Sequence, residues 1–146
     1  MADFNFIDKG LLDYKVCWDL QEELLAGIVA AKRISGGAVP ENYFLLVEHP
    51  HVYTLGKSGD EHNLLIREDF LAQIGATYYR INRGGDITYH GPGQLVGYPV
   101  IDLEYYHIGI RAFIEKMEDS ITGTLTEFGL AGQRKEGATG VWLDAE

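Results

Sequence analysis

The segment RGGDITYHGPGQLVGYPVIDL, residues 83–103, is rich in glycine although its other residues alternate as in β-strands. Glycine weakens a strand because it loses more backbone entropy on folding and offers no side chain to pack. Gly84 and Gly85 would let the backbone bend sharply and bring its N–H groups close to a bound carbonyl or carboxylate. The residues therefore indicate the wall of a substrate site, in which bare backbone stabilises an oxygen atom.

A purely structural interpretation of the same segment stays open. DITYH and QLVGYPVI are strand-like runs joined by GPG, and one hairpin with a glycine–proline turn would account for Gly91 and Gly93. It would not account for Gly84 and Gly85, which precede the hairpin. In the strand itself, period-two alternation puts the side chains on two faces. We expect Thr88 and His90 to face a pocket, and Ile87 and Tyr89 to enter the core.

Two histidine positions could take part in chemistry. Because histidine side chains in general titrate near neutral pH, His90 could relay a proton in a glycine-lined pocket, or it could only stabilise the turn that follows it. His49 and His51 form an H-x-H pair around a proline, but no further ligand falls at a spacing that completes a zinc site. We expect no metal. Lys57 either pairs with an anionic ligand at its loop or is an ordinary exposed lysine.

The sequence lacks a convincing nucleophile and a nucleotide-binding motif. Cys17 lies on the apolar stripe of an amphipathic helix, where a thiolate would not be stabilised, so we interpret it as a packing residue. No serine occupies a strand–turn–helix elbow. The glycine segment has neither the spacing of a dinucleotide-binding loop nor the Gly-Lys-Ser/Thr end of a P-loop.

Composition is that of one ordinary globular domain of 146 residues, with 46% hydrophobic and 23% charged residues. The net charge of −10 would repel a phosphate backbone, so nucleic acid is a poor candidate partner. No apolar run reaches the roughly 18 residues that cross a membrane. The N-terminus does not resemble a secretory signal, and the single cysteine gives no internal disulfide. We expect a cytoplasmic protein.

The N-terminal half predicts strands and one long helix. Alternation over residues 4–7 predicts a first strand, and Asp13 is a suitable N-cap for the helix after it. Residues 35–40 form a loop, residues 43–47 and 52–55 are strands interrupted at His49 and Pro50, and residues 67–74 form a short helix. The buried stripe of the long helix repeats at three- and four-residue spacing and comprises Tyr14, Cys17, Leu20, Leu24, Leu25 and Ile28.

The C-terminal half predicts a further strand, a second long helix and a last strand. ATYYRINR is a β-rich run that leads into the glycine segment, AGQRKEGA is a polar loop, and TGVWL begins a strand. That last strand needs a neighbour, so we expect more chain to follow it. Interleaved strands and helices predict an α+β fold, a mixed and largely antiparallel sheet covered by helices. The second helix ends near Gly129, and its apolar face comprises Ile110, Phe113, Ile114, Met117, Ile121, Leu125 and Phe128.

The glycine segment closely resembles the signature of the lipoate-biosynthesis octanoyltransferases, which share a superfamily with lipoate and biotin protein ligases. VEHPHVYTLGKSG, residues 47–59, resembles an earlier segment of that family, and GATGVWL, residues 137–143, resembles its approach to the catalytic region. The matches occur in the family's order over nearly the whole chain. The resemblance implies the catalytic-domain fold of the biotin and lipoate protein ligases.

The resemblance also implies an activity and its partners. Family members transfer an octanoyl group from octanoyl-acyl carrier protein to a lysine on the lipoyl domains of 2-oxoacid dehydrogenases or on the glycine-cleavage H protein. They need no cofactor and no ATP, and neither nucleic acid nor a membrane takes part. By motif, the substrate-binding residues here would be Arg83, Gly84, Gly85, Asp86, Ile87, Thr88, Tyr89 and His90.

One part of the family pattern is not matched. The family uses a cysteine that carries the acyl group as a thioester and a lysine that lowers the pKa of that cysteine, and both follow the GVW segment. Cys17 matches neither position, so we expect no catalytic residue within residues 1–146 and expect the pair beyond Glu146. Residues 1–146 would then be the N-terminal portion of a single catalytic domain, inactive alone. The alternatives are an ATP-dependent lipoate or biotin ligase and a non-catalytic acyl-binding domain.

Overall fold

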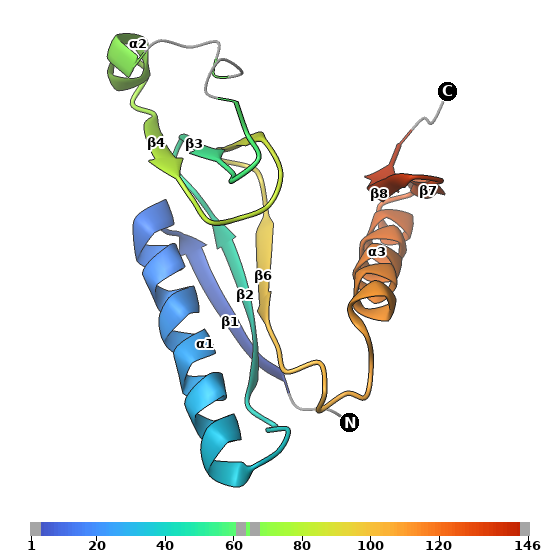
Figure 1. Ribbon diagram of the computed structural model, residues 1–146. Helices are drawn as coiled ribbons and strands as arrows, with labels where there is room; N and C mark the ends of the chain where they lie inside the picture. Colours follow the sequence, from blue (N-terminus) through green and yellow to red (C-terminus); the bar gives the residue numbers. More distant parts are fainter. Residues whose placement is uncertain (1–3, 61–63, 65–67, 144–146) are drawn as a thin grey trace. The chain divides into compact units, whose positions relative to one another are not determined.

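The computed structural model describes residues 4–60, 64 and 68–143, which divide into two compact units, Met1–Ile101 and Asp102–Glu146 (Figure 1). The fold is α+β with mixed sheets, as predicted. Arg67, the predicted start of the short helix, lies outside the described residues. The elements are β1 (Phe4–Leu11), α1 (Tyr14–Ser35), β2 (Asn42–Glu48), β3 (Val52–Leu55), α2 (Glu68–Gln73), β4 (Thr77–Arg80), β5 (Ile87–His90), β6 (Val96–Val100), α3 (Ile110–Glu127), β7 (Gln133–Lys135) and β8 (Ala138–Trp142).

Helix α1 begins and ends with well-formed caps. Its N-cap is Asp13, whose carboxylate accepts hydrogen bonds from the backbone N–H groups of Lys15 and Val16 at 2.9 and 3.1 Å. Gly36, at a φ of 71°, ends the helix and bonds back to the carbonyl of Lys32. The predicted stripe is confirmed except at Leu25, which is 51% exposed. The helix turns about 100° per residue, so this position falls beside the stripe.

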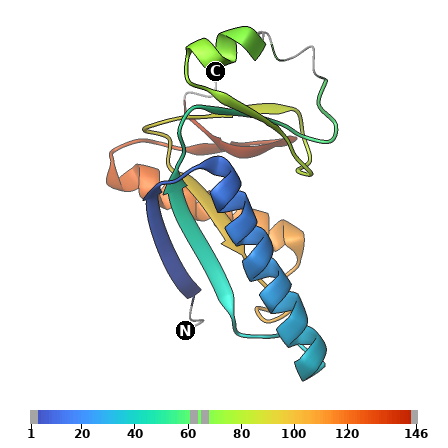
Figure 2. The same cartoon turned by 90° about the vertical axis from the view of Figure 1, so that its left-hand side faces the viewer.

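The first sheet has the strand order β1-β2-β6, with β1 parallel and β6 antiparallel to β2. Helix α1 lies along this sheet in both ribbon views (Figures 1 and 2). The apolar core between them comprises Cys17, Ile28, Val39, Leu45, Val47 and Val100. On the strands, Phe6 stacks on Phe44, and a Cβ at Gly97 would lie 2.8 Å from the ring of Phe44. Gly97 therefore leaves the room that this aromatic ring occupies.

The second sheet of the first unit has the order β4-β3-β5, with β4 parallel and β5 antiparallel to β3. The predicted hairpin is therefore wrong, because β5 pairs with β3 whereas β6 pairs with β2. The chain that carries β5 and β6 runs back along the chain that carries β2 and β3, and both chains bend from one sheet into the other. The segment Gly91-Pro92-Gly93 lies at this bend.

The second unit consists of α3 and a two-stranded antiparallel sheet of β7 and β8. The predicted helix and last strand are confirmed. The polar segment AGQRKEGA contains β7, so its prediction as a loop is wrong in part, and β7 is the neighbour that β8 requires. The predicted apolar face is open at three of its residues, since Ile110, Ile121 and Phe128 are 66%, 47% and 77% exposed. Among the residues described, no helix is long and apolar enough to cross a membrane.

Candidate active site

The glycine loop after β4 packs backbone to backbone against the loop after β3. The N–H of Lys57 donates to the carbonyl of Arg83 at 2.9 Å, and the N–H of Gly56 donates to the carbonyl of Asp86 at 3.3 Å. A Cβ at Gly56 would lie 2.3 Å from the carbonyl oxygen of Gly85, closer than any real contact. Gly56 is therefore required for the two loops to meet.

The side chain of Arg83 wraps around its own loop. Its guanidinium donates to the carbonyl of Gly84 at 2.8 Å, to that of Asp86 at 3.2 Å and to the hydroxyl of Thr88 at 2.7 Å. Gly85 has a φ of 88°, a conformation that favours glycine. Gly84 and Gly85 are exposed, and a Cβ at Gly84 would meet nothing within 4 Å. Arg83 thus holds the loop in shape while its backbone stays open to a ligand.

The prediction that Ile87 and Tyr89 both enter the core is wrong at Tyr89, whereas Ile87 is half-buried opposite the fully buried Leu55. In the antiparallel register with β3, Thr88 lies opposite Thr54 and His90 lies opposite Val52, and both partners are fully buried. Tyr89 lies on the other face and is 43% exposed, with its hydroxyl 2.5 Å from Nδ1 of His51. The alternation of side chains along a strand does not tell which face is buried. Here Tyr14 of α1 stacks on His90 and so covers part of the face that carries it.

A cluster of aromatic rings from separate elements surrounds His90. The ring of His90 stacks on Tyr14 at a centroid distance of 6.1 Å and meets the edge of His49 at 5.8 Å. His49 is buried, and its Nδ1–H donates to the carbonyl of Leu12 at 2.7 Å, while its Nε2 accepts from the hydroxyl of Tyr98 at 3.0 Å. Sequence reasoning missed Tyr14 and Tyr98 as neighbours of His90, since nothing in their spacing links them.

Burial and neighbouring charges set the ionisation of this cluster. Burial lowers the pKa of His49, so the ring is neutral at physiological pH. Burial also raises the pKa of Tyr14 and of Tyr98, although the positive charge of Arg83 opposes the shift in both. The ring of His49 is therefore uncharged, and the phenols of Tyr14 and Tyr98 keep their hydroxyl protons.

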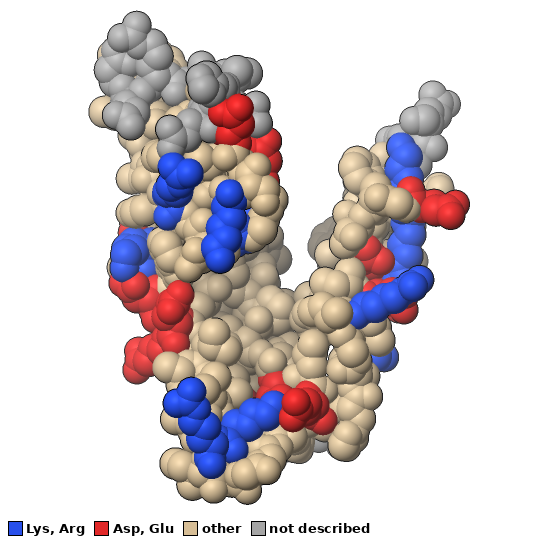
Figure 3. Space-filling view, viewed as in Figure 1, with Lys and Arg blue, Asp and Glu red and all other residues tan. Residues whose placement is uncertain are grey.

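The other residues considered from the sequence show no sign of a catalytic or metal-binding role. Cys17 is fully buried in the core of the first unit, and burial raises the pKa of its thiol, which confirms the packing interpretation. Lys57 is exposed. Among the described residues, no group of three or more His, Cys, Asp and Glu side chains is placed to hold a metal ion. On the face seen in Figure 3, acidic and basic side chains of the first unit are interspersed.

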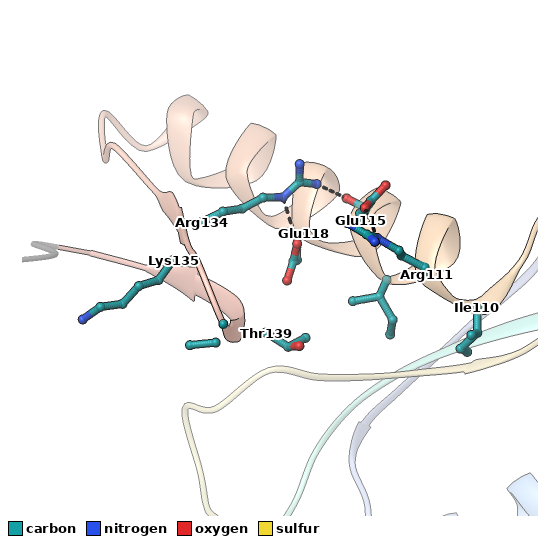
Figure 4. Close-up of a pocket in the computed structure, with 10 residues that line it drawn as sticks. Ile110, Arg111, Glu115, Glu118, Arg134, Lys135 and Thr139 are labelled. Carbon is teal, nitrogen blue, oxygen red and sulfur yellow. Dashed lines mark hydrogen bonds and ion pairs between the residues drawn. The ribbon is translucent and has the colours of Figure 1, made fainter.

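The second unit contains a separate cavity of about 470 Å³ between α3 and the β7–β8 sheet (Figure 4). Its wall is organised by Glu118, whose carboxylate accepts from the N–H of Gly140 at 2.8 Å and pairs with Arg134 at 2.8 Å. Arg134 also pairs with Asp119 at 3.0 Å and donates to the carbonyl of Glu115. These bonds fasten the β7–β8 sheet to α3.

Residues 13–146 match the family model of the lipoyl protein ligase A/B catalytic domain. The chain belongs to this family. Members similar to it include the octanoyltransferases of Christiangramia forsetii and Flavobacterium psychrophilum, each 54% identical over 139 and 140 residues, and that of Bacteroides thetaiotaomicron, 45% identical over 138 residues. These alignments cover 92%, 93% and 94% of this chain but 59%, 60% and 60% of the relatives. The chain thus spans about three fifths of their length.

Solved structures show the same fold in the family. A candidate lipoate protein ligase from T. acidophilum is 16% identical, with a TM-score of 0.58 over 94% of this chain and 53% of that protein. A structure of the same protein with bound lipoic acid gives a TM-score of 0.54 at 15% identity, over 95% and 55% of the two chains. At this identity the likeness concerns the fold alone, and it confirms the fold class expected from the sequence.

Proposed function

We propose that the protein transfers an octanoyl group from octanoyl-acyl carrier protein to a lysine of lipoyl domains, either of 2-oxoacid dehydrogenases or of the glycine-cleavage H protein. Both units would belong to one catalytic domain, working in the cytoplasm without a cofactor. The single observation that carries this proposal is the open glycine backbone held by Arg83 beside His90, in a chain 54% identical to octanoyltransferases.

The proposed binding surface is the segment from Arg83 to His90. Exposed N–H groups of Gly84 and Gly85 would stabilise the thioester oxygen as it gains negative charge. Behind this surface, Thr54 lies opposite Thr88 and is fully buried, so the loop is carried by a packed strand. Asp86, Ile87 and Tyr89 would fix the backbone conformation of the segment from Arg83 to His90.

Cys17 is not proposed as the residue that carries the acyl group. It is buried in the core and lies on the same helix face as Ile28, away from solvent. Its raised pKa also disfavours the thiolate, which is the form that attacks a thioester. Replacing it with serine would therefore test packing and not acyl transfer.

The test is transfer by the full-length protein from octanoyl-acyl carrier protein to a purified lipoyl domain, followed by intact mass of the lipoyl domain. Arg83→Ala should lower kcat/KM by about tenfold or more, because the loop loses three hydrogen bonds to its guanidinium. Arg33→Ala, at the exposed end of α1, is the matched control and should transfer normally. Normal transfer by Arg83→Ala would contradict the proposed site.

An ATP-dependent lipoate ligase is the second candidate, because a protein of the same fold is known with bound lipoic acid. The two activities differ in their donor. Supplying ATP and free lipoate without an acyl carrier protein should leave the lipoyl domain unmodified if the octanoyltransferase proposal is correct. Modification under these conditions would favour the ligase. A non-catalytic acyl-binding protein would modify the lipoyl domain in neither assay.

A further inference from the structure

A tight turn brings Gln94 back onto His90. The N–H of Gln94 donates to the carbonyl of Gly91 at 3.1 Å, with Pro92 and Gly93 at the central positions and Gly93 at a φ of 85°. Proline followed by a residue of positive φ is the pattern of a type II turn. A Cβ at Gly91 would lie 2.3 Å from the hydroxyl of Tyr89, so the glycine where the turn starts leaves room for that side chain.

The amide of Gln94 defines which nitrogen of His90 carries the proton. Its Oε1 lies 2.6 Å from Nδ1 of His90, and its Nε2 makes a longer contact of 3.5 Å with the carbonyl of Tyr89. The opposite amide orientation would place Oε1 against that carbonyl, two acceptors facing each other. An amide oxygen can only accept, so Nδ1 of His90 is the donor. In the neutral ring, Nε2 is then the acceptor.

The rings around His90 hold its plane. Tyr14 from α1 is stacked on it with an interplanar angle of 15°, and His49, after β2, meets it edge-on. In the part of the chain that the structure describes, Tyr14 and His49 are the titratable side chains whose rings contact His90, while Val52 of β3 lies opposite in the ladder. Arg83 acts electrostatically on Tyr14. A ring held in one plane and one tautomer presents Nε2 in a defined direction.

We propose that Gln94 is a positioning residue, which holds His90 in the Nδ1–H tautomer so that Nε2 accepts a proton during acyl transfer. This inference rests on the proposed octanoyl transfer. The lysine amine of the lipoyl domain bonds to the thioester carbonyl carbon, and the C–S bond breaks with its electron pair on sulfur. The proton lost by the amine goes to Nε2 of His90 and then to the sulfur, which leaves as a thiol. No other reactant is needed.

The tautomer can be measured without any activity. Long-range ¹H–¹⁵N spectra of the histidine side chains, recorded on the full-length protein where the rings are neutral, should show the proton of His90 on Nδ1. Gln94→Ala should release it to a mixture with the Nε2–H form. Gln133→Ala, on β7 of the second unit, is the matched control and should leave the His90 signals unchanged. A wild-type ring protonated on Nε2, or one insensitive to Gln94→Ala, would overturn the inference.

The role in the reaction is tested separately by the pH dependence of kcat. Gln94→Glu keeps an acceptor for Nδ1–H, so we expect it to retain transfer better than Gln94→Ala. Its carboxylate favours the imidazolium, so the acid limb of the profile should move to higher pH. If Gln94→Glu has the same pH profile of kcat as wild type, although the spectra show the expected tautomer of His90, then His90 is not the proton acceptor. A protein that transfers no octanoyl group at all would overturn the proposed function, while the spectra would still decide the tautomer.

Discussion

The N–H of Gly93 donates to the Oε2 atom of Glu48 at 2.7 Å, across 45 residues of sequence. Glu48 ends β2, and Gly93 lies in the turn between β5 and β6, so this bond joins the two chains where they bend from one sheet to the other. The same turn places Gln94 against His90. A surface carboxylate thus helps to position the candidate site.

Glu48→Ala should destabilise the protein by about 1 kcal/mol, the usual loss for one hydrogen bond that is partly exposed. Urea denaturation measures this change. Glu41→Ala is the matched control, because Glu41 is an exposed carboxylate just before the same strand, and it should change the stability by less than about 0.5 kcal/mol. Equal stability of both variants would show that the Glu48 bond does not hold the turn.

Gly56→Ala should destabilise the protein by about 1–3 kcal/mol, because the added methyl group would overlap the backbone of the glycine loop. The displaced loop should also bind the octanoyl donor more weakly, which appears as a higher KM. Gly84→Ala provides the comparison, since a Cβ there meets nothing within 4 Å, and its stability should match wild type within about 0.5 kcal/mol. Wild-type stability and KM in Gly56→Ala would argue against close packing of the loops.

The lowered pKa of His49 makes stability depend on pH. The unfolded chain binds a proton near the ordinary histidine value of 6.5, whereas the folded protein resists protonation until lower pH. Stability is therefore fully present above 6.5 and decreases as the pH falls toward the folded pKa, by at most about 1.4 kcal/mol per pH unit.

Urea denaturation at about pH 7.5 and about pH 5.5 measures this dependence. Compared with wild type, His49→Gln should lose less stability on acidification, because the buried titrating ring is gone. His107→Asn is the control, since His107 is exposed and asparagine tolerates its φ of 54°. If His49→Gln loses as much free energy of unfolding between these two pH values as wild type does, another group causes the acid sensitivity.

Glu118→Ala should destabilise the second unit by about 2 kcal/mol or more, because Arg134 and the N–H of Gly140 both lose a largely buried partner. Hydrogen exchange of the Gly140 amide reports the effect directly and should become faster. Glu115→Ala removes an exposed ion pair with Arg111 one helical turn away, and should cost at most about 0.5 kcal/mol. An unchanged exchange rate at Gly140 would mean that Glu118 does not hold β8.

Sequence alone was sufficient for the elements whose signals are local. The carboxylate of Asp13 and the stripe through Cys17 and Ile28 determine where α1 begins and which face it buries, since both act within a few turns of one helix. Proline after His49 separates β2 from β3 for the same local reason. The glycine loop beside Arg83 was also identified from the sequence, because bare backbone needs an explanation wherever it occurs.

Tertiary structure alone decided how these elements meet. Strands β5 and β6 could have paired with each other across the turn at Pro92, and they pair instead with β3 and β2 in separate sheets. Which face of β5 is covered depends on contacts such as that of His90 with Tyr14, far away in α1, and Tyr89 on the other face is left 43% exposed. Side chains alternate between the two faces of a strand whichever face is buried. Only contacts between residues distant in sequence could therefore decide which face of β5 is covered.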